Sequence, residues 1–248
     1  MKRKIKSSLR HLRRSVAPPF WPISRKQYVW TVRPKPGPHP LTRSIPLGIV
    51  IRDLLGYATS MKEARRILAE KKIAVDGRIV TDYKFPIGLM DVIHILPEDK
   101  YYRVVPDEKA KLKLIEIRKE EAVHKLGRVI RKQTVPGGAI QITLHDGRNL
   151  ILSKEGTEGQ SNIKPFDSVL ITIPKQSLVR HIPLKEGILA VVTEGRHTGF
   201  VGRIESIQHI FKRRNAIVVL KNEKGETIRT VLEYILPVGE EQSVLTIG

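Results

Sequence analysis

The chain has 248 residues, enough for two or three small hydrophobic cores, and its 45 Lys and Arg against 25 Asp and Glu give a formal net charge of +20 at pH 7. It contains no cysteine, which excludes disulfides and thiolate metal sites. Its eight histidines include no pair at i, i+4, so we expect no metal site and no metal cofactor. The charge instead favours a polyanionic partner.

Residues 1–40 are expected to form an extended basic arm that orders only against RNA. Thirteen Lys and Arg residues precede the first acidic residue, Asp53, and the same stretch holds half of the prolines. The candidate RNA-binding cations of the arm are Lys2, Arg3, Lys4, Lys6, Arg10, Arg13, Arg14, Arg25, Lys26, Arg33 and Lys35. Trp21 and Trp30 interleave with these cations, and two roles stay open for them: stacking on bases, or anchoring the arm on its own protein.

A membrane partner is not expected. The chain has no apolar run of about 18 residues, its beginning lacks the apolar core of a signal peptide, and the arm lacks the apolar face of a surface helix.

Residues 41–100 predict a short apolar helix, a basic amphipathic helix and an Asp-Gly hairpin. Ser60 stands three residues before Glu63, which predicts a capping box at the start of the second helix. Apolar residues at helical spacing would face the core: Met61, Ala64, Ile67 and Leu68. The dipeptide Asp76-Gly77 suits the positive φ angles of a type I′ turn.

Cations gather on the other side of this unit. We expect RNA contacts from Arg43, Lys62, Arg65, Arg66, Lys71, Lys72 and Arg78. The run GYATSMKEARRILAEKKIAVDGRIV resembles the S-four-type RNA-binding module of ribosomal proteins, some tRNA synthetases and pseudouridine synthases. Thr59 and Met61 stand where that module often has arginines, so the resemblance places the RNA contacts later in the helix.

Residues 101–178 predict a small β-domain of undetermined role. The segment AIQITLHDGRNLILS places Asp146-Gly147 between two alternating arms and predicts a hairpin, and DSVLITIP predicts a further strand. Asp107 and Glu108 are adjacent carboxylates, but they follow a proline and precede a lysine-rich stretch, so we interpret them as a polar break and expect no catalytic pair.

Residues 179–248 predict a small barrel. An apolar run over residues 188–192 leads into Gly195, Gly199 and Gly202, a spacing that permits a sharp loop between strands. This segment resembles a KOW motif. A loop that binds a nucleotide phosphate would need G-x-x-x-x-G-K-[ST] or G-x-G-x-x-G, and the chain has neither pattern. Candidate RNA contacts are Arg196, His197, Lys212, Arg213 and Arg214, which could equally be solvated loop residues.

The succession of arm, S-four-type module, β-domain and KOW-like unit resembles the S-four-e family of small-subunit ribosomal proteins. The resemblance implies an α+β, multi-domain, non-catalytic protein of cytoplasmic ribosomes that binds ribosomal RNA beside neighbouring ribosomal proteins, with no cofactor or small-molecule substrate. The shortness of the chain and its lack of cysteine favour an archaeal member. Two alternatives remain: a KOW-bearing transcription or translation factor, and an accessory to an RNA-modifying enzyme, although no catalytic constellation is evident over residues 101–248.

Overall fold

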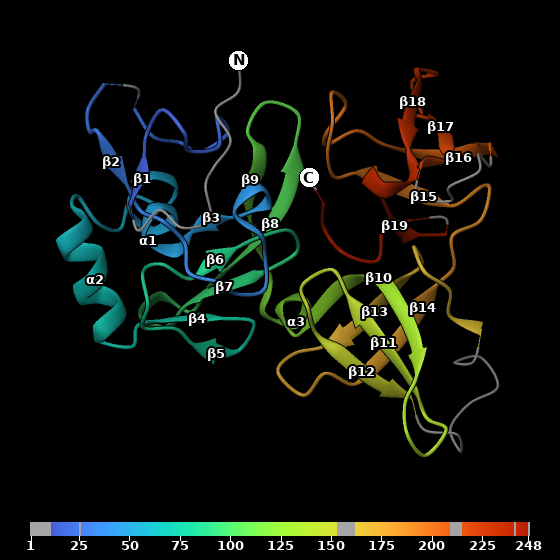
Figure 1. Ribbon diagram of the computed structural model, residues 1–248, viewed down its shortest axis with the longest axis horizontal. Coiled ribbons are helices and arrows are strands. Elements are labelled where there is room, and N and C mark those ends of the chain that lie inside the picture. Colours follow the sequence, from blue (N-terminus) through green and yellow to red (C-terminus); the bar gives the residue numbers. More distant parts are fainter. Residues whose placement is uncertain (1–10, 25, 153–161, 209–214, 241, 248) are drawn as a thin grey trace.

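The computed structural model describes residues 11–24, 26–152, 162–208, 215–240 and 242–247 (Figure 1). It is a mixed α+β structure with few helices, in which three five-stranded antiparallel sheets follow one another along the chain. No helix of the described segments is long and apolar enough to cross a membrane.

The first sheet and its helices make up the N-terminal half. The sheet has the strand order β5-β4-β7-β8-β9. Its strands are β4 (Ile73–Val75), β5 (Arg78–Ile79), β7 (Val92–Ile95), β8 (Lys100–Asp107) and β9 (Lys111–Ile117). The helical parts are α1 (Leu47–Ile49), a π-helical turn (Val50–Leu54), α2 (Met61–Ala69), and 3-10 turns at Leu41–Arg43 and Leu96–Glu98. A small pair, β3 (Ile45–Pro46) with β6 (Pro86–Ile87), lies beside them.

Helix α2 begins where the sequence predicts. The hydroxyl of Ser60 accepts a hydrogen bond of 3.2 Å from the backbone N–H of Glu63, while the carboxylate of Glu63 accepts one of 2.8 Å from the N–H of Thr59. The reciprocal bond therefore reaches one residue earlier than in a capping box. Ala64 and Leu68 are fully buried, so the predicted apolar stripe does face the core.

The Asp76-Gly77 turn is confirmed, with φ angles of 49° and 74°. The predicted boundary between residues 100 and 101 is wrong, however. Strand β8 pairs with β7 on one side and β9 on the other, so the sheet of the helix-hairpin unit continues to Ile117. One apolar core beneath this sheet includes both Ile73 from β4 and Val104 from β8.

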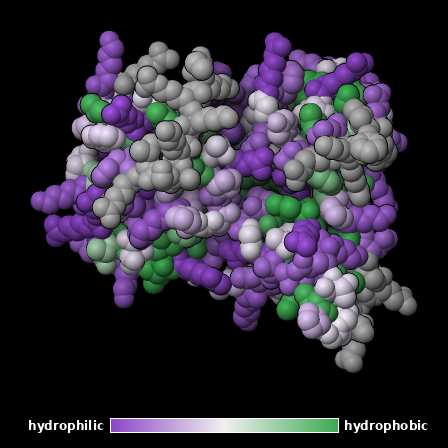
Figure 2. Space-filling view, in the orientation of Figure 1, coloured by the Kyte–Doolittle hydropathy of each residue, from purple (hydrophilic) through white to green (hydrophobic). Residues whose placement is uncertain are grey.

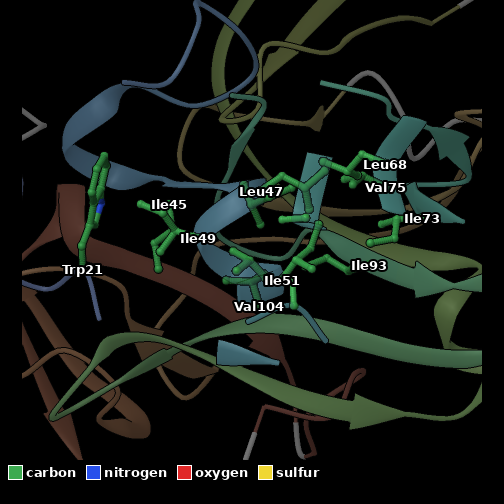
Figure 3. Close-up of a cluster of buried hydrophobic side chains, with 14 of the residues drawn as sticks. Trp21, Ile45, Leu47, Ile49, Ile51, Leu68, Ile73, Val75, Ile93 and Val104 are labelled. Carbon is green, nitrogen blue, oxygen red and sulfur yellow. The ribbon is translucent and has the colours of Figure 1, made fainter. Parts of the chain in front are cut away.

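The arm is not wholly extended, and the expectation of a disordered arm is wrong for residues 11–24 and 26–40. These residues form the pair β1 (Leu12–Arg13) and β2 (Trp30–Thr31), and they contribute Leu12, Trp21 and Ile23 to the same core as α2. Trp21 is only 2% exposed and its Nε1–H donates to the carbonyl of Ser44 at 2.7 Å. Figure 3 shows its ring next to Ile45 and Ile49. A few large apolar side chains bury enough surface to hold a proline-rich segment in place.

The second sheet has the order β12-β11-β10-β13-β14 and encloses its own core, which includes Val129, Ile142 and Val169. The predicted Asp146-Gly147 hairpin is confirmed between β11 and β12. The elements of this part are the short helix α3 (Lys119–Ala122) and the strands β10 (His124–Thr134), β11 (Ile140–Leu144), β12 (Asn149–Leu152), β13 (Ser168–Thr172) and β14 (Leu178–Ile182).

The third sheet has the order β18-β17-β16-β15-β19. Its elements are β15 (Leu189–Val192), β16 (Val201–Gln208), β17 (Ile217–Lys221), β18 (Thr227–Val231), a 3-10 turn (Leu232–Tyr234) and β19 (Ile235–Gly239). An apolar cluster joins it to the second sheet, with Leu126 and Leu170 packed in the same group as Leu236 and Val238.

The glycines in the β15–β16 loop and at the start of β16 serve different purposes. Gly195 and Gly199 have φ angles of 94° and 87°, whereas Gly202 lies in a strand where a Cβ would meet the carbonyl oxygen of Lys221 at 2.7 Å. A Cβ on Gly199 would also lie 2.7 Å from the backbone nitrogen of Glu108. The loop therefore packs tightly on the turn between β8 and β9.

We expect Gly199→Ala to lower the free energy of unfolding by about 1 to 3 kcal/mol, because it adds a close backbone contact to an unfavourable φ. Gly225→Ala is the matched control: its φ is 84°, but a Cβ there meets nothing within 4 Å. Denaturant unfolding of both variants measures the difference. Equal losses would show that the loop does not approach Glu108 this closely.

Candidate nucleic-acid interface

A ridge of five cations runs along α2 and its end. We call Lys62, Arg65, Arg66, Lys71 and Lys72 the α2 ridge. All five are exposed, while the opposite side of the helix is buried. Figure 2 shows hydrophilic side chains projecting from the margin of the molecule where α2 lies. The helical period separates an apolar stripe from a charged one, so the fold itself presents these cations to the outside.

Glu70 forms ion pairs with two cations of the α2 ridge. Its carboxylate lies 3.0 Å from Nε of Arg66 and 2.6 Å from Nζ of Lys72, and these partners, Lys72 first, lower the pKa of Glu70. Arg65 lies over the ring of Tyr83 at 4.1 Å and donates to its hydroxyl at 2.9 Å. The guanidinium of Arg65 is thus held in one orientation.

The predicted arm residues separate into two groups. The prediction that Trp21 contacts RNA is wrong, because its ring is buried in the core and cannot stack on a base. Arg14 is tied to its own chain, with Nε and Nη2 donating to the carbonyl of Ile23 at 3.2 and 2.7 Å. Trp30, by contrast, is 54% exposed and the guanidinium of Arg13 lies 5.6 Å from its ring centre.

Other predicted residues make contacts within the protein. Lys35 is bridged to Asp82 at 2.5 Å, a contact that raises the pKa of Lys35. Arg43 is bridged to Glu194 at 2.6 Å, so it joins the helix-hairpin unit to the loop after β15. Lys35 and Arg43 therefore form ion pairs within the protein. Lys26, Arg78 and Arg196 are exposed, and Arg33 and His197 are half-buried.

Nine predicted residues lie outside the described segments: Lys2, Arg3, Lys4, Lys6, Arg10, Arg25, Lys212, Arg213 and Arg214.

A buried ionic cluster, which the sequence analysis did not identify, centres on Lys125 of β10. Its Nζ lies 2.6 Å from Asp76, 2.6 Å from Asp91 and 3.1 Å from Asp146, and its side chain is 1% exposed. Arg148 adds contacts of 2.6 Å to Asp76 and 2.9 Å to Asp146. We call these five residues the Lys125 cluster.

The cluster joins three parts of the chain. Asp76 lies in the β4–β5 turn and Asp91 directly before β7, both at the first sheet. Lys125 lies in β10 and Asp146 in the β11–β12 turn, both at the second sheet, and His39 of the arm reaches Asp91 at 3.0 Å. Three carboxylates converging on one amine would offer a cation site, but the amine of Lys125 already occupies its centre. The Lys125 cluster therefore links the arm to the first and second sheets through ion pairs.

Burial and charge oppose each other in this cluster. Burial alone would raise the pKa of Asp146, but Lys125 and then His145 bring it down to about 2. Burial would likewise lower the pKa of Lys125, yet Asp76, Asp91 and Asp146 raise it above its ordinary value. Burial also lowers the pKa of neighbouring His145 to about 4, and its Nδ1 accepts from the N–H of Arg128 at 3.1 Å. The amine and the carboxylate of Asp146 are charged at neutral pH, and His145 is neutral.

Three family models match successive segments of the chain, and the third begins within the first sheet, before β8. The RS4NT (NUC023) domain matches residues 6–42, the S4 domain matches residues 50–93, and Ribosomal family S4e matches residues 98–178. The second of these spans the whole α2 ridge.

Two curated relatives are both described as small ribosomal subunit protein eS4. That of Ignicoccus hospitalis is 45% identical over 239 residues, covering 95% of this chain and 94% of its own, and that of Pyrobaculum arsenaticum is 49% identical, covering 96% and 98%. Among solved structures, the crystal structure of the 30S ribosomal protein S4e from Thermoplasma acidophilum matches with a TM-score of 0.66 and 31% identity. It covers 80% of this chain and 96% of that one.

Proposed function

The chain belongs to ribosomal family S4e and is a structural constituent of the small ribosomal subunit, and we propose from this premise that it holds ribosomal RNA mainly on the α2 ridge. The observation that carries the proposal is the place of the ridge. Three exposed cations lie on one side of a helix whose other side is buried, two more follow directly after its end, and all five fall within the segment that matches the S4 domain.

The physics of such a surface is electrostatic. Lys and Arg neutralise phosphates and release condensed counterions, so affinity falls steeply with salt. Selectivity then comes from the shape of the folded RNA and from unpaired bases, since side chains cannot read the deep groove of an RNA helix.

We propose three further RNA contacts around the ridge. They are the exposed cations of the arm, the tip of the β4–β5 hairpin at Arg78, and the KOW-like loop that carries Arg196 and His197. Glu194 of this loop forms an ion pair with Arg43, which supports a fixed position of the loop relative to the helix-hairpin unit. In this proposal residues 179–248 form a KOW-type unit, the protein works in cytoplasmic ribosomes beside other ribosomal proteins, and it has no catalytic role.

Lys62→Glu combined with Arg66→Glu should weaken binding to small-subunit ribosomal RNA and make the slope of log K against log salt shallower by about 1.4 to 1.8, since two phosphate contacts are lost. Arg65 is left in place because it also holds Tyr83. Filter binding from low to high salt measures both quantities.

The matched control is Lys221→Glu with Lys224→Glu, which makes the same change in net charge on two exposed lysines at the β17–β18 hairpin. If the control pair lowers affinity and slope as much as the ridge pair, binding depends on net charge and the ridge is not the site.

A further inference from the structure

We propose that a groove between the arm and α2 takes up one unpaired nucleotide of RNA, with its base between aromatic rings and its phosphate on the neighbouring cations. The proposal rests on the proposed function, because it assumes an RNA partner, and it adds a second kind of recognition to the phosphate contacts of the ridge.

The groove lies where the β1–β2 pair of the arm meets the start of α2 and the segment after β5. Its volume is about 510 Å³, which falls in the range of about 300 to 1,000 Å³ usual for sites that hold small ligands. The rings of Tyr28, Trp30 and Tyr83 line it, and the imidazole of His11 lies with its centre 5.6 Å from that of Trp30.

The rings of Tyr28 and Trp30 are available to a ligand. Tyr28 and Trp30 are each 54% exposed, although large aromatic rings are usually well buried. Trp21 of the same arm is 2% exposed, which shows that this segment can bury an indole. The contrast assigns the anchoring role to Trp21 and leaves Trp30 for contact with a partner.

The charge of the groove fits a nucleotide. Its described lining includes the cations Arg33, Arg65 and Lys84 and contains no Asp or Glu. Arg65 lies 4.1 Å and Lys84 5.5 Å from the ring centre of Tyr83. Arg65 therefore covers a face of Tyr83, so we expect the base to stack on the exposed rings of Tyr28 and Trp30 while its phosphate meets the cations held at Tyr83.

An unpaired nucleotide fits better than a duplex. A base inside a helix is stacked on both faces and cannot lie against a protein ring, whereas a splayed base can. Stacking tolerates any base because every base has a π-face, so we expect little preference between uridine and adenosine. The ridge would bind phosphates of folded RNA while the groove holds a base that leaves the stack.

The test uses the full chain with two probes: a six-nucleotide oligouridine that carries one 4-thiouridine, and a blunt RNA duplex of about 16 base pairs. Trp30→Ala should weaken oligouridine binding by about 5- to 150-fold, the range found when one stacking ring is removed, and leave duplex binding unchanged. Trp30→Phe should restore most of the binding. Val29→Ala, 70% exposed beside Trp30 but outside the groove lining, should behave as wild type.

Irradiation of the complex should join the thiouridine to peptides that contain Tyr28, Trp30 or Tyr83. Failure of the wild type to bind oligouridine, equal binding by Trp30→Ala, or crosslinks only elsewhere would each overturn the groove proposal. None of these results touches the ridge, since duplex binding and its salt slope test that separately. Circular dichroism of each variant confirms that the fold is retained.

Discussion

Trp21→Ala should lower the free energy of unfolding by about 3 to 5 kcal/mol, the cost usual for removing a large aromatic side chain from a core. The ring is 2% exposed, packs in the same cluster as Leu47 and Leu68, and donates its Nε1–H to Ser44. The substitution would leave a cavity and an unpaired carbonyl together. Thermal and denaturant unfolding measure the loss.

Trp30→Ala is the matched control, because it removes an indole from the same arm at an exposed site. It should leave stability nearly unchanged. If the two variants melt alike, residues 11–40 are not packed on the core, and the arm is the free segment that its composition predicts.

Lys125→Met should destabilise the protein by about 3 to 5 kcal/mol at pH 7, since it leaves three buried carboxylates without their central cation. Methionine keeps much of the volume of the lysine stem, so the loss reports on charge more than on packing. Lys100→Met is the control: its amine pairs with Glu98 at 2.8 Å at an exposed site, and stability should hardly change.

The loss in Lys125→Met should shrink by about 1 kcal/mol or more between pH 7 and pH 4. In the wild type the pKa of Asp146 is lowered to about 2, so its contribution is present above its ordinary value and is lost as the pH falls towards 2. The raised pKa of Lys125 gives a contribution that is lost only in strong alkali. Without the amine, the carboxylates take up protons at higher pH, which relieves their repulsion. A penalty that does not change with pH would show that the carboxylates are not charged partners of Lys125.

Local patterns in the sequence predict the helix-hairpin unit well. The start of α2 follows from Ser60 and Glu63, its buried stripe from the helical period, and both Asp-Gly turns from the φ angles that they favour. Each of these depends on residues close together in the chain. The exposure of the α2 ridge follows from the same period.

Contacts between distant residues escaped prediction. Asp76 and Asp146 were recognised as turn residues, but a turn pattern does not show that both carboxylates meet the same lysine, 49 and 21 residues away along the chain. The sequence likewise allows two roles for Trp21, stacking on a base or packing on its own protein, because composition does not tell where a lone indole lies. The predicted domain boundary at residue 100 is wrong because the pattern of a strand does not indicate which strand it pairs with.

The protein combines buried contacts that hold its parts together with exposed cations on its surface. Buried ties, centred on Trp21 and the Lys125 cluster, fix the arm and the first two sheets against one another. Exposed cations and rings are then presented on a rigid body, which lowers the entropic cost of binding RNA.

Sedimentation of reconstituted small subunits after a wash in about 1 M salt separates a structural component from a transient factor, because the Debye length falls there to about 3 Å and loosely held basic proteins are released. We predict that the protein stays with the washed particle in equal amount to the other subunit proteins. Its release into the supernatant while those proteins remain would contradict a structural place in the subunit and would mark the protein as a transient factor.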